Sequence, residues 1–120
     1  MSVPRLETYI DRIIASGARA MQYVEGMDRI MFRTDQIRQD AVIANIMAIG
    51  ECVTKIMDGF PDFTLDHPEI PWRDIKNMRN RIAHQYFQLD IDTIWVTVDL
   101  MIPELVSQLS YARNRHAQGE

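Results

Sequence analysis

Basic and titratable side chains gather in one segment of the chain, between Met78 and Tyr86. The segment reads Met-Arg-Asn-Arg-Ile-Ala-His-Gln-Tyr, so that Arg79 lies five residues before His84 and Tyr86 two residues after it. A histidine exchanges protons near neutral pH, and an arginine offers fixed donors to phosphate oxygens. Such a pair suits cleavage of an RNA phosphodiester, because that reaction needs proton transfer and stabilisation of a charged transition state.

The charge of this segment differs from the charge of the whole chain. Residues 72–86 hold four basic residues against one acidic residue, whereas the 120-residue chain has a formal net charge of −4. A local basic surface on an acidic protein indicates a confined anion site and argues against general coating of nucleic acid. Arg73, Lys76 and Arg81 are therefore candidate contacts to an RNA backbone, and Asn80 is a candidate to orient a phosphate or a ribose.

A helix over residues 71–85 should carry these side chains. Apolar residues recur there at steps of three and four, which gives the stripe Trp72, Ile75, Met78, Ile82 and Tyr86. The opposite face is polar and includes His84, and an ordinary solvated face would have the same pattern. Arg79 and His84 project about 140° apart on an ideal helix. They can therefore act on one phosphate only if the helix ends near His84 or if a second copy of the chain completes the site.

The remaining elements are also expected to be helical. Apolar periodicity predicts long helices over about 5–25, from 34 or 35 to 58, and from 90 or 92 onward with a kink at Pro103, together with a short helical turn at 28–32. Glycines and prolines mark 59–71 as a loop, and residues 113–120 should form a frayed tail. The fold class is thus all-α: one domain spanning 1–120, an up-and-down antiparallel bundle of four main helices with one short extra helix.

Composition narrows the class of protein. The single Cys52 excludes an intramolecular disulfide and should be a small buried hydrophobe, which suits a reducing compartment and a cytoplasmic location. No secretory signal is visible, and no apolar run is long enough to span a membrane. The run from Ala41 to Gly50 is apolar almost all round, so it must be covered on more than one side, by the bundle itself or, more easily, by a homodimer.

Three further titratable residues are weaker candidates. Glu51 follows the apolar run and should be buried in a structural ion pair with Arg38 or Arg79. His67 is expected in an exposed loop, and His116 in the tail. Because the histidines lack the spacing of metal ligands and Cys52 has no partner, we expect no metal and no cofactor.

The segment from Arg79 to Tyr86 resembles the Arg-x4-His-x-Tyr signature of HEPN-domain proteins. More specifically, the chain resembles the HepT-type toxins that are paired with minimal nucleotidyltransferase antitoxins. The resemblance extends in order along most of the chain, through Gln39–Val42, Ile49–Glu51, Pro71–Arg73 and Asp90–Trp95. It implies a HEPN-type bundle and a metal-independent endoribonuclease whose active-site residues are Arg79 and His84, at a cleft between two copies of the chain.

The same resemblance implies a regulatory role for Tyr86. In related toxins the nucleotidyltransferase partner transfers AMP to the motif tyrosine, which would place a charged, bulky group beside His84 and Arg79. The alternative is that Tyr86 packs in the core with Ile82 and Met78, as an ideal helix would have it.

A second interpretation of the whole chain also stays open: a non-catalytic HEPN module that binds a nucleotidyltransferase, a nucleotide or RNA. The sequence does not identify the RNA.

Overall fold

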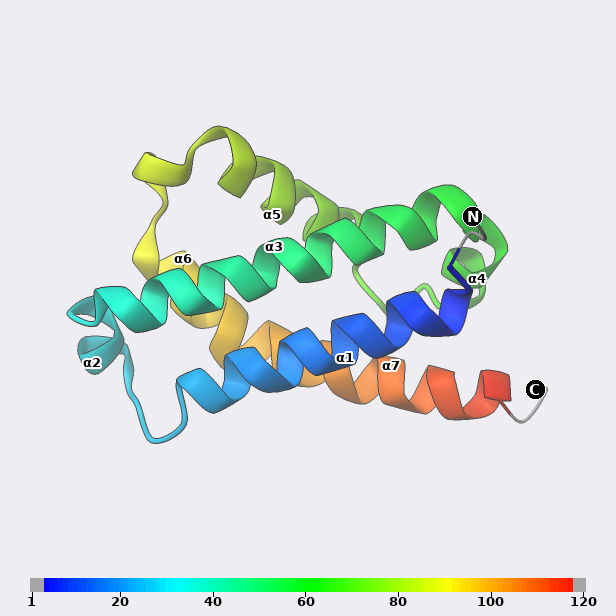
Figure 1. Cartoon of the computed structure of the whole chain (residues 1–120), viewed down its shortest axis with the longest axis horizontal. Coiled ribbons are helices and arrows are strands. Elements are labelled where there is room, and N and C mark those ends of the chain that lie inside the picture. Colours follow the sequence, from blue (N-terminus) through cyan, green and yellow to red (C-terminus); the bar gives the residue numbers. More distant parts are fainter. Residues whose placement is uncertain (1–3, 118–120) are drawn as a thin grey trace.

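The computed structural model describes residues 4–117, and the regular structure within that range is helical (Figure 1). The elements in chain order are α1 (Leu6–Tyr23), α2 (Arg29–Arg33), α3 (Gln36–Gly59), α4 (Pro61–Asp66), α5 (Trp72–His84), the 3₁₀ turn η1 (Tyr86–Gln88), α6 (Ile91–Val96), the π-helical turn η2 (Thr97–Met101) and α7 (Ile102–Ala117). The long helices α1, α3, α5 and α7 alternate in direction, which confirms the predicted all-α up-and-down bundle. No helix in this range is long and apolar enough to cross a membrane.

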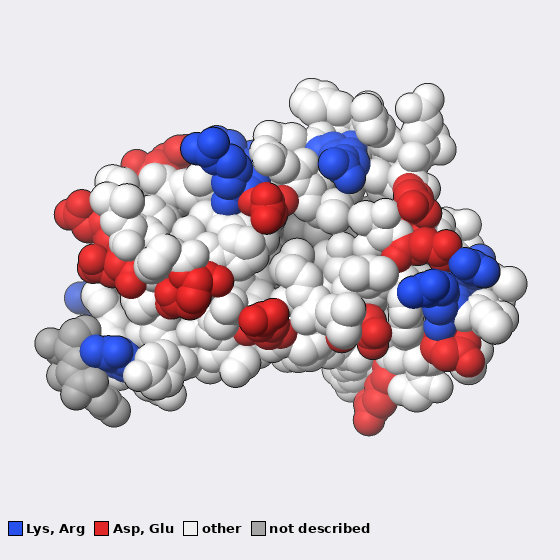
Figure 2. All heavy atoms as spheres, turned by 180° about the vertical axis from the view of Figure 1, so that it is seen from behind, with Lys and Arg blue, Asp and Glu red and all other residues white. Residues whose placement is uncertain are grey.

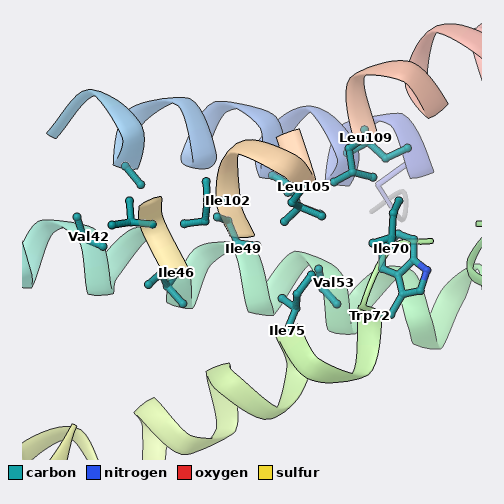
Figure 3. Packing of buried hydrophobic residues seen from close by; sticks show 14 of the residues in the cluster. Val42, Ile46, Ile49, Val53, Ile70, Trp72, Ile75, Ile102, Leu105 and Leu109 are labelled. Carbon is teal, nitrogen blue, oxygen red and sulfur yellow. The ribbon is translucent and has the colours of Figure 1, made fainter. Parts of the chain in front are cut away.

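Helix α3 is the centre of the bundle. It packs against α1 on one side and α5 on another, and α7 packs along α1 (Figure 1). Side chains of α3 such as Ile49 and Val53 are buried among residues of α5 and α7, as Figure 3 shows. Ala44 and Ala48 are left exposed. The apolar character of α3 is therefore largely satisfied within one chain and does not by itself require a second copy.

Short-range capping explains where two of the helices begin. The Asp35 carboxylate accepts a hydrogen bond from the Arg38 amide at 3.0 Å and starts α3, and the Asp90 carboxylate accepts one from the Asp92 amide at 3.0 Å and starts α6. Each cap was one of the two positions that the sequence allowed. The short helix expected at 28–32 is also present, as α2.

Two segments are more helical than expected. The predicted loop at 59–71 contains α4, because Pro61 occupies a first-turn position where its missing amide donor costs nothing. The predicted tail at 113–120 is helical as far as Ala117, and residues 118–120 lie outside the described residues. Arg113 and His116 tie this end to α1 through Asp11, at 3.1 Å, and Glu7, at 2.8 Å.

The expected distortion at Pro103 lies just before that residue. Pro103 is the second residue of α7 and directly follows the π-helical turn η2. The backbone stays helical through Thr97 and Ile102, so α6, η2 and α7 form one continuous helical course. A wider turn at this point accommodates the proline ring and its missing donor.

Candidate active site

The polar residues of the motif are positioned by the packing of α5 on α3. Trp72, Ile75 and Ile82 of α5 are buried, as the predicted stripe requires. The Trp72 indole also donates a hydrogen bond to the backbone oxygen of His67 at 3.0 Å, which fixes the start of the helix. The burial of this face directs the remaining positions of α5 toward the edge of α3 or toward solvent.

Arg79 lies directly against α3 at Gly50. A Cβ atom at position 50 would collide with Cβ of Arg79 and would lie 2.7 Å from its Cγ. A glycine is needed here because the two helices approach closely. The backbone at Gly50 is ordinary helix, since the glycine with a positive φ in the described range is Gly26. Gly50 therefore determines how near the Arg79 side chain lies to α3.

The guanidinium of Arg79 is held by two further residues of α3. Its Nη2 donates a hydrogen bond to Thr54 Oγ1 at 3.2 Å, and that hydroxyl donates in turn to the Gly50 backbone oxygen at 2.9 Å. Its Nε lies 3.4 Å from Glu51 Oε1, which is an ion pair without hydrogen-bond geometry, so this buried Nε has no hydrogen-bond partner within the described residues. The partner expected for Glu51 is thus confirmed. Its expected burial is wrong, because the Glu51 side chain is 55% exposed.

His84 is the last residue of α5 and is exposed. The Gln85 amide donates to the Arg81 backbone oxygen at 2.8 Å and closes the final turn. Within residues 4–117 the His84 ring makes no hydrogen bond or ion pair and leaves both nitrogens accessible. One chain therefore presents Arg79 against α3 and His84 toward solvent, with no hydrogen bond between them.

Tyr86 follows the end of α5 and lies in η1. Its side chain is 46% exposed, and its hydroxyl donates a hydrogen bond to Asp40 Oδ1 of α3 at 3.3 Å. The same oxygen accepts a hydrogen bond from Gln36 Nε2 at 2.9 Å. The negative charge of Asp40 raises the pKa of Tyr86, so the phenol is neutral at physiological pH. The alternative prediction that Tyr86 packs in the core is wrong, because α5 ends at His84 and Tyr86 lies beyond it, in η1.

The four supporting candidates are spread along α5 and have no partners of their own within the described residues. Arg73 and Arg81 are exposed, Lys76 and Asn80 are half-buried, and none of the four side chains makes a hydrogen bond or ion pair within the described part of the chain. Arg73 borders a shallow hollow of about 320 Å³ at the start of α5, whose wall includes Trp72. The structure does not bring Arg73 together with His84, which lies at the other end of the helix.

The other titratable residues lie elsewhere. His67 is half-buried rather than exposed, since its ring lies 4.5 Å from that of Phe63 and its Nδ1 lies 2.9 Å from Glu69 Oε1. Cys52 is half-buried, and that burial raises the pKa of its thiol. Between residues 4 and 117 no group of three or more His, Cys, Asp or Glu side chains is arranged to hold a metal ion.

Three residues of the site were not singled out from the sequence. Gly50, Thr54 and Asp40 belong to α3 and meet α5 or η1 only in the folded chain, where Thr54 is 25 residues from Arg79 and Asp40 is 46 residues from Tyr86. A glycine within a long apolar helix was the one available signal, because such a glycine often marks a close helix contact.

Comparison with known proteins identifies relatives over most of the chain. A family model described as "Ribonuclease HepT-like" matches residues 13–112. The chain is 36% identical over 100 residues to "Probable ribonuclease HepT" of Thermococcus cleftensis, covering 80% of this chain and 88% of that protein. It is 29% identical to a protein of Caldanaerobacter subterraneus that is provisionally named an RNase, covering 91% and 93% of the two chains. A similarly named protein of Methanocaldococcus jannaschii is 34% identical, with 82% and 76% covered. No solved structure gives a significant match.

Proposed function

Because this chain belongs to the HepT-like ribonuclease family, we propose that it is a metal-independent endoribonuclease that acts as the toxin of a toxin–antitoxin pair in the cytoplasm. The observation that carries this proposal is the arrangement of α5, which anchors Arg79 on α3 and ends at the exposed His84. RNA is the substrate class, and Arg81, Lys76, Asn80 and Arg73 are its supporting contacts. The proposed reaction requires no cofactor.

The proposed chemistry is transesterification within the RNA strand. The 2′-oxygen attacks the adjacent phosphorus, the bond from phosphorus to the 5′-oxygen breaks, and the products are a 2′,3′-cyclic phosphate and a 5′-hydroxyl. His84 accepts the 2′-hydroxyl proton or donates a proton to the leaving 5′-oxygen. Arg79 stabilises the charge that develops on the phosphate oxygens, and its anchorage on α3 means that it need not reorganise during the reaction.

A homodimer resolves the separation of the two catalytic groups. In one chain Arg79 faces α3 and His84 faces solvent. Two copies related by a two-fold axis would bring two such motifs to one cleft, where each phosphate could meet groups from both chains. We therefore place the active site at a dimer cleft rather than within one bundle.

The proposal is tested by incubating the purified chain with single-stranded RNA in excess EDTA. Cleavage should persist, and the new ends should be 2′,3′-cyclic phosphates because no water enters the first step. An RNA with 2′-deoxy or 2′-O-methyl riboses should stay intact. Loss of all cleavage in EDTA would contradict metal independence, and cleavage of the 2′-deoxy strand would contradict the transesterification step.

We further propose that a minimal nucleotidyltransferase partner silences the toxin by transferring AMP to Tyr86. The position of Tyr86 in η1, two residues after His84, supports this role because the side chain is 46% exposed and a single hydrogen bond, to Asp40, holds its hydroxyl. Co-expression with such a nucleotidyltransferase should increase the mass of the Tyr86 peptide by one adenylyl group and abolish RNA cleavage. The Tyr86→Phe variant should remain unmodified and stay active beside the partner. Silencing of Tyr86→Phe to the same extent would show that the partner acts by another route.

The second candidate function is a non-catalytic module that binds the nucleotidyltransferase, a nucleotide or RNA. The divergence of Arg79 and His84 within one chain favours this alternative. It requires that His84→Ala leave both growth inhibition and binding unchanged, whereas the ribonuclease proposal requires that growth inhibition disappear.

A further inference from the structure

The aromatic ring of Phe87 is the most exposed large hydrophobic side chain in the described range, at 98%. It lies in η1, three residues after His84. Leaving a phenylalanine in water forgoes the stabilisation that burial would give. Because single exposed apolar side chains are common on protein surfaces, the functional interest of Phe87 comes from its place three residues after His84.

The ring of Phe87 is exposed, but the neighbouring Tyr86 ring supports it. Its ring packs edge to face with that of Tyr86, with centroids 5.6 Å apart and an interplanar angle of 80°. Tyr86 is fixed in turn by its hydrogen bond to Asp40 of α3. An edge-to-face contact pairs the edge of one ring with one face of the other, so at least one face of Phe87 stays available to a ligand.

The segment before Phe87 in the chain is basic, whereas Asp90 follows it by three residues. No acidic residue occurs in the sequence from Ile75 to Leu89, and Lys76, Arg81 and His84 have no ion-pair partner within the described residues. Asp40 borders this surface, and its Oδ1 already accepts hydrogen bonds from Tyr86 and Gln36. On the face seen in Figure 2, the basic atoms nearest the middle of the upper edge lie among uncharged atoms, whereas other basic atoms of that face border acidic ones.

We propose that Phe87 is a base-stacking residue of the RNA site, and that the RNA enters this site single-stranded. The inference rests on the proposed ribonuclease function and names its substrate form. A protein partner would be expected to meet a contiguous apolar patch, whereas a single ring that follows a basic helix fits a nucleobase flanked by its phosphates. The face of a base in a duplex is already stacked on its neighbours, so only an unpaired base can occupy Phe87.

Chain geometry limits which nucleotide this is. Three residues span at most about 11 Å, so the backbone positions of Phe87 and His84 lie within that distance of each other. The stacked base therefore belongs to a nucleotide near the phosphate that is cleaved. Because each of the four bases has an aromatic face, the site should accept an unpaired base of any identity.

The test uses binding of a short, fluorescently labelled RNA with 2′-O-methyl riboses, which cannot be cleaved. Phe87→Ala should weaken binding about tenfold relative to wild type, and Phe87→Trp should preserve it. Tyr111→Ala removes an aromatic ring that is 63% exposed on α7 and should leave binding unchanged. A blunt duplex of the same sequence should bind at least tenfold more weakly than the single strand.

Each result decides the proposal. The proposal would be overturned if Phe87→Ala bound the oligonucleotide as tightly as wild type, or if the duplex bound as tightly as the single strand. It would also be overturned if Phe87→Leu, which is apolar but has no aromatic face, kept the full affinity, or if wild type did not bind the oligonucleotide. If Phe87→Ala instead loses only the capture of a nucleotidyltransferase, the ring contacts protein and not RNA. Because the oligonucleotide cannot be cleaved, a stacking effect in a protein that fails to cut ordinary RNA would reject the ribonuclease proposal alone.

Discussion

Replacing His84 or Arg79 with alanine is expected to lower the rate of RNA cleavage by about 10²–10⁴-fold while the protein stays folded. Loss of a positioned proton-transfer group costs about this much, and loss of a preorganised donor to the transition state costs about 10²–10³-fold. His84 is exposed and makes no hydrogen bond within the described residues, so its removal should not affect packing. The measurement is single-turnover cleavage of a labelled RNA, with circular dichroism as the check on folding.

The matched control is His67→Ala, at a histidine that lies before α5, close to Phe63 and Glu69. It should cleave RNA at the wild-type rate. If His84→Ala keeps more than a tenth of the wild-type rate, His84 does not carry the proton transfer.

Mixing the two inactive variants tests whether the site is shared between copies. A dimer of one Arg79→Ala chain and one His84→Ala chain keeps one intact composite site if each site takes Arg79 from one copy and His84 from the other. Random exchange makes half of the dimers mixed, each with one of two sites, so activity should return to roughly a quarter of wild type. Failure of the exchanged mixture to recover activity would place both residues of a site in the same chain.

The second large effect is expected at Gly50, where alanine should damage both stability and activity. The added methyl group collides with the Arg79 stem, so α5 must move away from α3 or Arg79 must leave its site. Overpacking of this kind costs about 1–3 kcal/mol in the free energy of unfolding. RNA cleavage should fall at least tenfold, because Arg79 loses its position relative to Thr54 and Glu51.

Gly59→Ala supplies the control for this prediction. Gly59 ends the same helix, and a Cβ atom at that position would meet nothing within 4 Å. That variant should keep full activity and a wild-type or slightly higher free energy of unfolding, measured by urea denaturation. If Gly50→Ala behaves like Gly59→Ala, the close approach of α5 to α3 is not what positions Arg79.

Features that depend on local sequence were predictable from it. The stripe of Trp72, Ile75 and Ile82 follows from helical periodicity alone, and the caps at Asp35 and Asp90 follow from the chemistry of aspartate at a helix start. These features involve residues within a few positions of one another. Their structure is therefore largely determined before the chain packs.

Features that depend on contacts between distant segments were not predictable. The last turns of α7 are helical because Arg113 and His116 pair with carboxylates of α1, which no local pattern reveals. Glu51 was expected in the core because it follows an apolar run, yet it lies on the outer edge of α3 beside Arg79. The end of α5 was predicted to within one residue, at 85, whereas the contact of Tyr86 with Asp40, 46 residues away in the chain, was not.

The hydrogen bond that holds Tyr86 against Asp40 depends on the hydroxyl proton of the tyrosine, and transfer of AMP to that oxygen would remove this proton. An adenylylated oxygen has no hydrogen to donate, and its phosphodiester carries a negative charge that would face the Asp40 carboxylate. Two like charges at this distance repel, so the adduct would not stay against α3. The basic residue of α5 that is nearest to Tyr86 in the chain is Arg81. We therefore expect that adenylylation, in one covalent step, frees the tyrosine from α3 and directs its new anion toward the proposed RNA contacts of α5.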